Sequence, residues 1–193
     1  IAINNCGSSS PRTLNVSVNT VTSQPGTISG NTTVCSGSGQ TYSISPVTGA
    51  TSYSWTLPSG WSGSSSSTSI TTTVGSNGGT ISVIANNSCG SSSPRTLSVS
   101  VNTAPSQPGT ISGSSSVPAG TTKTYSISPV TGATSYIWSY NGIGSISGSG
   151  TSVNLTAYTS GTLSVAAKNE CGISNVKTKT ITTTGVATNF PLQ

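Results

Sequence analysis

Residues 41–55 (TYSISPVTGATSYSW) and residues 124–138 (TYSISPVTGATSYIW) are the same peptide, except that Ser54 in the first copy becomes Ile137 in the second. The copies lie 83 positions apart, which indicates a chain built from repeats. Within each copy, apolar residues alternate with Ser and Thr, as expected of half-buried β-strands. The PVTGAT segment between the two apolar runs indicates a turn, so each copy is predicted to form a hairpin.

The aromatic residues of these two hairpins are the predicted core. A two-stranded hairpin is not stable alone in water, so each copy must gather further strands around its aromatic side chains. Hydrophobic residues make up only 31% of the chain, which predicts a thin core. The predicted core residues are Tyr42, Tyr53 and Trp55 in the first copy and Tyr125, Tyr136 and Trp138 in the second.

The repeat length divides the whole chain. Residues 20–102 are the first complete repeat and residues 103–185 the second. Residues 1–19 (IAINNCGSSSPRTLNVSVN) match residues 84–102 (IANNSCGSSSPRTLSVSVN) almost residue for residue. We therefore expect residues 1–19 to be the C-terminal strands of a preceding, truncated repeat. Residues 186–193 fit no part of the period and are expected to be a tail or the start of a next unit.

Each repeat is predicted to contain about seven short antiparallel strands bounded by Gly, Pro, Asn or Ser, the pattern of an immunoglobulin-like sandwich. The Asn77-Gly78 pair is the strongest local signal of a tight hairpin. The predicted fold is therefore all-β, with immunoglobulin-like β-sandwich domains in a row. The predicted strands of the first repeat are residues 26–29, 32–35, 40–47, 52–57, 67–74, 80–86 and 94–101.

The charged residues argue against most active chemistries. The chain has no His and a single acidic residue, Glu170, so the paired titratable groups of general acid–base catalysis are missing. Hard metal ions prefer carboxylate oxygens, which are missing for the same reason. We therefore predict no enzyme activity, no catalytic residue, no metal ion and no cofactor. The six cations form no stripe with aromatic residues, and no apolar run is long enough to cross a membrane, so neither nucleic acid binding nor membrane insertion is predicted.

The four cysteines predict one disulfide bond. Cys35 precedes the strand that leads to Tyr42, and Cys89 follows the strand at residues 81–87, so we predict that these two are bonded within the first repeat. Disulfide bonds place a protein outside the cytoplasm. Cys6 and Cys171 are sequence counterparts of Cys89 and are predicted to be unpaired within this chain.

The predicted state of the unpaired cysteines leaves two alternatives open. The second repeat has Pro118 where the first has Cys35, so Cys171 has no partner in its own repeat. Cys171 is then either a buried, inert thiol or the site of a bond to another chain. Zinc binding is not expected, because no two cysteines are closely spaced.

The first repeat contains six short motifs, which are PGTISG at 25–30, VC at 34–35, TYSI at 41–44, VTGATSYSW at 47–55, PSGW at 58–61 and NSCG at 87–90. Together they resemble the PKD-like, immunoglobulin-like tandem repeats of large secreted surface proteins of Bacteroidota. The resemblance implies a secreted structural protein at the cell surface, exported by a type IX-like route and acting in cell adhesion as an adhesin, stalk or filament. It implies no catalytic residue. The second repeat departs from the pattern by losing the first cysteine and by having Tyr140 near the place of Trp61.

Two functional hypotheses follow for the partners of the chain. Outward-facing Ser and Thr leave strand edges almost free of the charges that normally block edge-to-edge pairing, so other copies or neighbouring repeats are predicted partners in a filament or stalk. The alternative is a carbohydrate-binding module for surface polysaccharide, in which Trp61 and Tyr140 are candidate ligand contacts. Core packing is the competing interpretation of these two aromatic residues.

Overall fold

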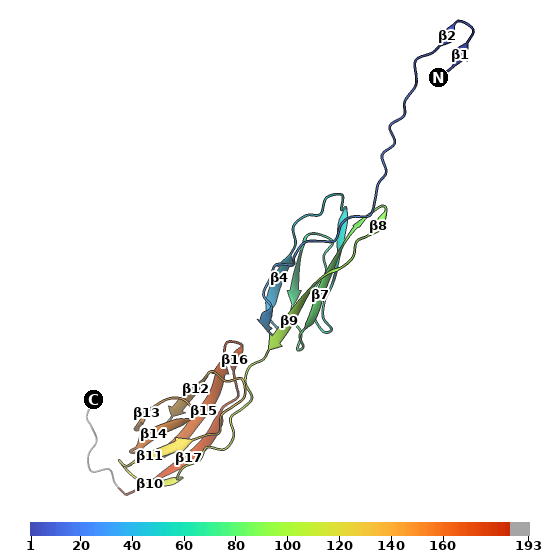
Figure 1. Cartoon of the computed structure of the whole chain (residues 1–193). Coiled ribbons are helices and arrows are strands. Elements are labelled where there is room, and N and C mark those ends of the chain that lie inside the picture. Colours follow the sequence, from blue (N-terminus) through green and yellow to red (C-terminus); the bar gives the residue numbers. More distant parts are fainter. Residues whose placement is uncertain (186–193) are drawn as a thin grey trace. The chain divides into compact units, whose positions relative to one another are not determined.

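The computed structural model describes residues 1–185, in which every regular element is a β-strand (Figure 1). The predicted all-β fold class is confirmed. The Cα positions form two compact units, and the second takes residues 33–38 and 74–78 together with the chain from Val99 onward. Residues 1–32, 39–73 and 79–98 form the first. The predicted tail or next unit at residues 186–193 lies outside the described part of the chain.

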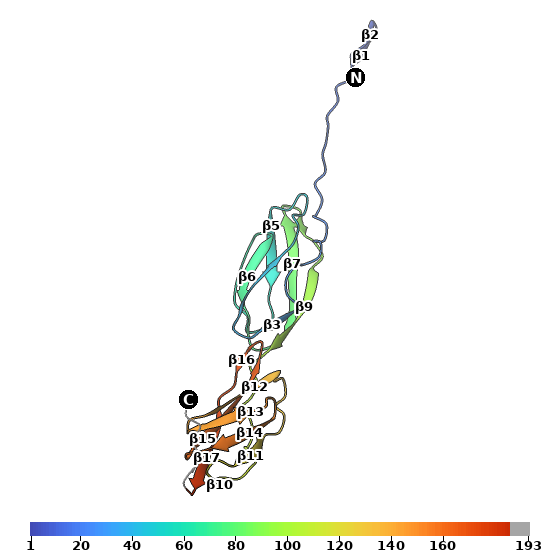
Figure 2. The ribbon, with the colours of Figure 1, turned by 90° about the vertical axis from the view of Figure 1, so that its left-hand side faces the viewer.

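The first unit is built from two small sheets, whose strands are visible in Figure 2. One sheet pairs β4 with β6, and the other pairs β5 with β7 and extends through β9. A short strand, β8, folds back against the end of β7. The strands are β4 (Gly39–Ser43), β5 (Ser52–Thr56), β6 (Ser69–Thr73), β7 (Gly79–Asn87), β8 (Gly90–Ser91) and β9 (Arg95–Asn102), the last of which runs on into the second unit.

The predicted hairpin of residues 41–55 is wrong. Strands β4 and β5 lie in different sheets, so the PVTGAT segment crosses between sheets instead of turning back within one. The crossing is held by Tyr53, whose hydroxyl accepts a hydrogen bond from the backbone N–H of Val47 at 2.8 Å. The Asn77-Gly78 hairpin is wrong for the same reason, because β6 and β7 also belong to different sheets.

The second unit repeats this two-sheet arrangement, and its smaller sheet has three strands instead of two (Figure 1). One sheet has the order β10-β17-β15-β12, with β16 paired to β15, and the other has the order β11-β14-β13. The unit also contains β3 (Thr33–Cys35). Its other strands are β10 (Ser116–Pro118), β11 (Thr122–Ser126), β12 (Ser135–Tyr140), β13 (Gly144–Ser147), β14 (Ser152–Ala157), β15 (Gly161–Asn169), β16 (Gly172–Ile173) and β17 (Lys177–Thr184).

Two strand pairs are parallel, which corrects the antiparallel expectation. Strand β3 pairs with the end of β9, with Cys35 opposite Asn102. Strand β10 pairs in the same way with β17, with Pro118 opposite Thr184. Parallel pairing requires a long connection between the two strands, and here the rest of each sandwich supplies it.

The aromatic residues predicted for the core divide into three groups. Tyr42, Tyr53 and Tyr125 are buried, as predicted. Tyr136 and Trp138 are half-buried and pack against the buried cluster of the second unit, which includes Leu155, Leu163 and Ile181. Trp55 is also half-buried rather than enclosed, and its indole N–H donates to the carbonyl oxygen of Ser67 at 2.9 Å.

Residues 1–19 have the sequence of residues 84–102 but only part of their structure. Strands β1 (Ile3–Asn4) and β2 (Gly7–Ser8) pair as a small hairpin, like the end of β7 with β8. No strand follows in residues 9–28. Leu14, Val16 and Val18 are therefore exposed, whereas Val99, the counterpart of Val16, is buried.

Candidate functional site

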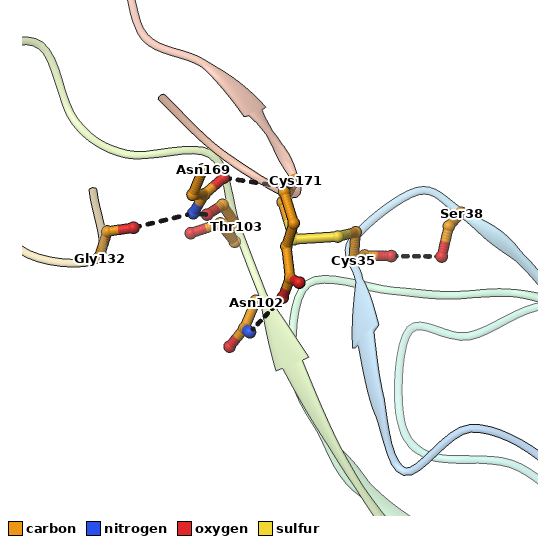
Figure 3. Close-up of a disulfide and its surroundings, with 8 residues drawn as sticks. Cys35, Ser38, Asn102, Thr103, Gly132, Asn169 and Cys171 are labelled. Carbon is orange, nitrogen blue, oxygen red and sulfur yellow. Dashed lines mark hydrogen bonds between the residues drawn. A yellow bond between two sulfur atoms is a disulfide. The ribbon is translucent and has the colours of Figure 1, made fainter. Parts of the chain in front are cut away.

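The second unit contains a disulfide bond between Cys35 and Cys171 (Figure 3). The two sulfur atoms lie 2.03 Å apart and the two Cα atoms 5.3 Å apart, although 136 positions separate the residues in the sequence. Cys35 is the last residue of β3, and Cys171 lies in the turn between β15 and β16. Each belongs to a different sequence repeat, so the bond links the repeats a second time, in addition to the backbone.

This bond replaces the predicted bond between Cys35 and Cys89, which is wrong. Cys89 is exposed and carries a free thiol. It lies before β9 begins, whereas Cys35 pairs with the last residue of that strand. The two ends of an eight-residue strand are about 23 Å apart at about 3.3 Å per residue, and a disulfide requires Cα atoms within about 7 Å.

The structure agrees with the prediction for Cys6 but not with the prediction for Cys171. Cys6 is exposed and free, as predicted for a residue without a partner in this chain. The prediction that Cys171 is unpaired is wrong. Neither alternative considered for it, a buried thiol or a bond to another chain, describes Cys171, because its partner lies in the same chain but in the other repeat.

Asn169 holds the turn that presents Cys171. Its side-chain oxygen accepts a hydrogen bond from the backbone N–H of Cys171 at 2.8 Å (Figure 3). Its side-chain nitrogen donates to the carbonyl oxygen of Thr103 at 2.8 Å and to that of Gly132 at 3.1 Å. One amide therefore fixes the cysteine turn to two separate loops.

Hydrogen bonds also fix the backbone around Cys35, the other cysteine of the disulfide. The hydroxyl of Ser38 donates to the carbonyl oxygen of Cys35 at 2.6 Å, and the backbone N–H of Ser36 donates to the carbonyl oxygen of Asn102 at 3.0 Å. Asn102 also donates from its side chain to Oε1 of Glu170 at 3.2 Å. The only acidic residue of the chain therefore lies beside the disulfide, where it accepts a hydrogen bond.

A cleft of about 600 Å³ lies next to the cysteine turn and is lined from residues 101–106, 131–134 and 169–170. Its lining contains Thr, Ser and Asn side chains and one carboxylate, that of Glu170, which accepts the hydrogen bond from Asn102. Within residues 1–185, no group of three or more His, Cys, Asp or Glu is placed to hold a metal ion. The disulfide and the hydrogen bonds of Asn169 show an arrangement that cross-links the chain and holds its loops.

The two candidate sugar contacts differ in burial. Trp61 is 9% exposed and its ring centroid lies 6.4 Å from that of Tyr42. Tyr140 is half-buried against the core of the second unit and donates its hydroxyl hydrogen to the carbonyl oxygen of Thr159 at 2.6 Å. Burial raises the pKa of the Tyr140 phenol. The expectation of an exposed stacking platform is therefore wrong for Trp61, whereas the ligand contact at Tyr140 remains a prediction.

Among the residues that the structure describes, no helix is long and apolar enough to span a membrane. The prediction of no membrane insertion remains a prediction.

Comparison with known proteins gives a family and a fold. The sequence profile of the PKD-like domain family matches residues 21–99 and 104–181. No protein among those with curated functions matches the chain. Domains A168–A170 of titin match 82% of this chain and 66% of their own, with 15% identity and a TM-score of 0.50. The Escherichia coli adhesin FdeC matches 82% of this chain and 63% of its own, with 19% identity and a TM-score of 0.45. The chain thus spans less than two thirds of either structure.

Proposed function

We propose that this chain, which belongs to the PKD-like domain family, is a non-catalytic structural segment of an extracellular bacterial surface protein. It acts as part of a stalk, adhesin or filament exported by a type IX-like route, as in the Bacteroidota proteins that its motifs resemble. Its partners are neighbouring repeats or other copies. The observation that supports this role is the disulfide between Cys35 and Cys171, which links two sequence repeats covalently.

The chemistry of the bond favours a location outside the cytoplasm. Thiols in the cytoplasm are kept reduced, whereas disulfide bonds persist in secreted and surface proteins. A thin core also benefits from such a cross-link, because small sandwiches bury little apolar surface. The carbohydrate-binding alternative is less favoured, because Trp61 is buried and Tyr140 is half-buried against the core of the second unit.

The position of the bond determines how the chain transmits tension. A pull on the two ends passes along the backbone to Cys35, through the two sulfur atoms, and out from Cys171. Residues 36–170 lie between the bonded cysteines and are bypassed. Tension therefore cannot extend most of the chain until the disulfide is reduced, which is the property required of a segment that holds a fixed length.

Single-molecule stretching tests this role. The chain is held by its two ends and extended with and without a reducing agent. At about 3.3–3.6 Å per residue, the bypassed segment adds about 450–490 Å of extension only after reduction. The Cys89→Ser variant should behave like the original chain, because Cys89 has no bond here. Equal extension before and after reduction would contradict the mechanical role.

Location is tested separately on cells of the source organism. Antibodies raised against the purified chain should label intact cells, and added protease should remove that label without lysis. Label that is found only after lysis would contradict the extracellular assignment, whatever the stretching experiment shows.

A further inference from the structure

The turn that carries Cys89 is built like the turn that carries bonded Cys171. The side-chain oxygen of Asn87 accepts a hydrogen bond from the backbone N–H of Cys89 at 2.9 Å, as Asn169 does for Cys171 at 2.8 Å. The side-chain nitrogen of Asn87 donates to the carbonyl oxygen of Thr20 at 2.8 Å. The equivalent bond in the second repeat, from Asn169, has the same length.

The surface next to Cys89 also reproduces the surface next to Cys171. A cleft of about 700 Å³ is lined from residues 18–23, 48–51 and 87–88. These are the sequence counterparts of the residues that line the cleft beside the disulfide. The two environments differ in one covalent respect, since Cys171 is bonded and Cys89 is exposed and free.

Residues 12–19 have the sequence of a strand that would place the cysteine of another repeat next to Cys89. They correspond to β9, whose last three residues pair in parallel with β3 and place Asn102 opposite Cys35. In residues 12–19 the alternating Leu14, Val16 and Val18 are 85%, 75% and 82% exposed. In an extended strand these apolar side chains would share one face, but residues 12–19 belong to no strand or sheet in the structure.

We propose that Cys89 forms a disulfide with a preceding PKD-like repeat. The first strand of that repeat pairs in parallel with residues 17–19 and places its cysteine opposite Asn19, as Cys35 lies opposite Asn102. The sulfur of that cysteine then meets Cys89 as the sulfur of Cys35 meets Cys171. The partner is thus a repeat that has a cysteine at the position of Cys35, followed directly by residues 1–19.

The bond forms by thiol–disulfide exchange with a low-molecular-weight disulfide. The thiolate of one cysteine attacks that disulfide, forms a mixed disulfide and releases one small thiol. The second cysteine then attacks the mixed disulfide and releases the other small thiol. Two protein thiols are oxidised to one disulfide, and the small disulfide is reduced to two thiols.

The disulfide bonds between repeats then all run in the same direction along the chain. A cysteine in the first strand of one repeat bonds to the turn cysteine of the following repeat. Pro118 occupies the first-strand position of the second repeat, so no forward bond can start there. The inference concerns which thiols pair in any oxidising environment, so it goes beyond the proposed role at a cell surface and can fail independently of it.

An extended chain tests the pairing directly. A copy of residues 20–83 is fused before Ile1, which completes the preceding repeat because residues 1–19 match residues 84–102. The protein is refolded with oxidised and reduced glutathione and digested with trypsin without reduction. Cleavage after Arg12 and Arg95 leaves the copied cysteine in one peptide with Cys6, and Cys35 in another with Cys89.

The peptide masses then distinguish the outcomes. Forward pairing joins the peptide of the copied cysteine to the peptide that contains Cys89. Pairing within repeats gives no link between those two peptides and would overturn the proposal, as would a free thiol at Cys89. The Cys89→Ser variant should lose the link, and the Cys6→Ser variant should keep it. In every variant the bond between Cys35 and Cys171 reports that the chain has folded.

Discussion

The ring of Tyr125 lies against Gly113, which has a positive φ of 125°. A Cβ atom added to Gly113 would lie 2.5 Å from Cδ1 of Tyr125, closer than real Cβ contacts. The hydroxyl of the same tyrosine donates to the carbonyl oxygen of Ser114 at 2.8 Å. Tyr42 has the same relationship to Gly30 in the first unit, where the added Cβ would lie 2.2 Å from the ring.

The Gly113→Ala variant is expected to be destabilised because the new methyl group overlaps the Tyr125 ring and the backbone becomes strained. The free energy of unfolding should fall by about 2–6 kcal/mol, the combined range for overpacking and backbone strain. Gly109→Ala is the matched control, because an added Cβ there meets nothing within 4 Å. Urea unfolding measures both variants, and equal stability of the two would contradict the contact.

Alkaline pH is expected to destabilise the second unit. Burial raises the pKa of the Tyr125 phenol above its ordinary 10.0, with a further contribution from Tyr140. As pH rises above 10, the unfolded chain releases this proton before the folded chain does, so stability is present below that pH and lost above it. Thermal unfolding from about pH 8 to about pH 11 should show the loss. The loss should be smaller in Tyr125→Phe, and because lysines titrate in both chains, an identical loss in both would contradict the prediction.

Removing the disulfide is expected to cost stability through the unfolded state. In the chain-entropy model, a closed loop of 136 residues contributes about 5 kcal/mol at 25 °C. The Cys171→Ser variant should therefore unfold at a clearly lower temperature than the original chain. Cys89→Ser tests the effect of the substitution itself, since that thiol is exposed and free. The two variants are compared by calorimetry, and matching transitions would show that the bond does not stabilise the fold.

Trp61 is expected to matter for folding and not for sugar binding. It is almost fully buried beside Tyr42, so Trp61→Ala should lower the free energy of unfolding of the first unit by about 3–5 kcal/mol. Trp55→Ala should cost less, because Trp55 is only half-buried. Tryptophan fluorescence during urea unfolding follows both variants. Retention of each on immobilised polysaccharide should be unchanged relative to the original chain.

The sequence allowed most of the strands themselves to be predicted. The predicted strand at residues 26–29 is wrong, because only an isolated bridge at Ser29 forms there. Alternation of apolar and hydroxyl side chains placed strands at residues 52–57 and 80–86, and the structure has β5 and β7 there. Such alternation is a local property, and it requires only that one face of the strand is buried. The burial of Tyr42 and Tyr125 followed from the same pattern.

The partner of each strand and of each cysteine could not be predicted in this way. Alternation in β4 is the same whether its neighbour is β5 or β6, so the pattern does not distinguish a hairpin from a crossing between sheets. The number of cysteines did not identify the bonded pair either. Bonding Cys35 to Cys89 or to Cys171 leaves two thiols unpaired in either case. The pairing is decided by the parallel register of β3 with the end of β9, which places Cys35 too far from Cys89 for a disulfide bond.

The parallel pairing of β10 with β17 has a consequence for how the second repeat yields under force. These are the first and last strands of that repeat, paired from Ser116 opposite Thr182 to Pro118 opposite Thr184. Tension reaches β10 once the disulfide between Cys35 and Cys171 is reduced, because β10 lies between the two bonded cysteines. The backbone then enters at one end of this short ladder and leaves at the other, so opposed pulls slide the strands past each other in shear. All of the ladder's hydrogen bonds must then rupture together, whereas an antiparallel pair pulled from one end would unzip bond by bond.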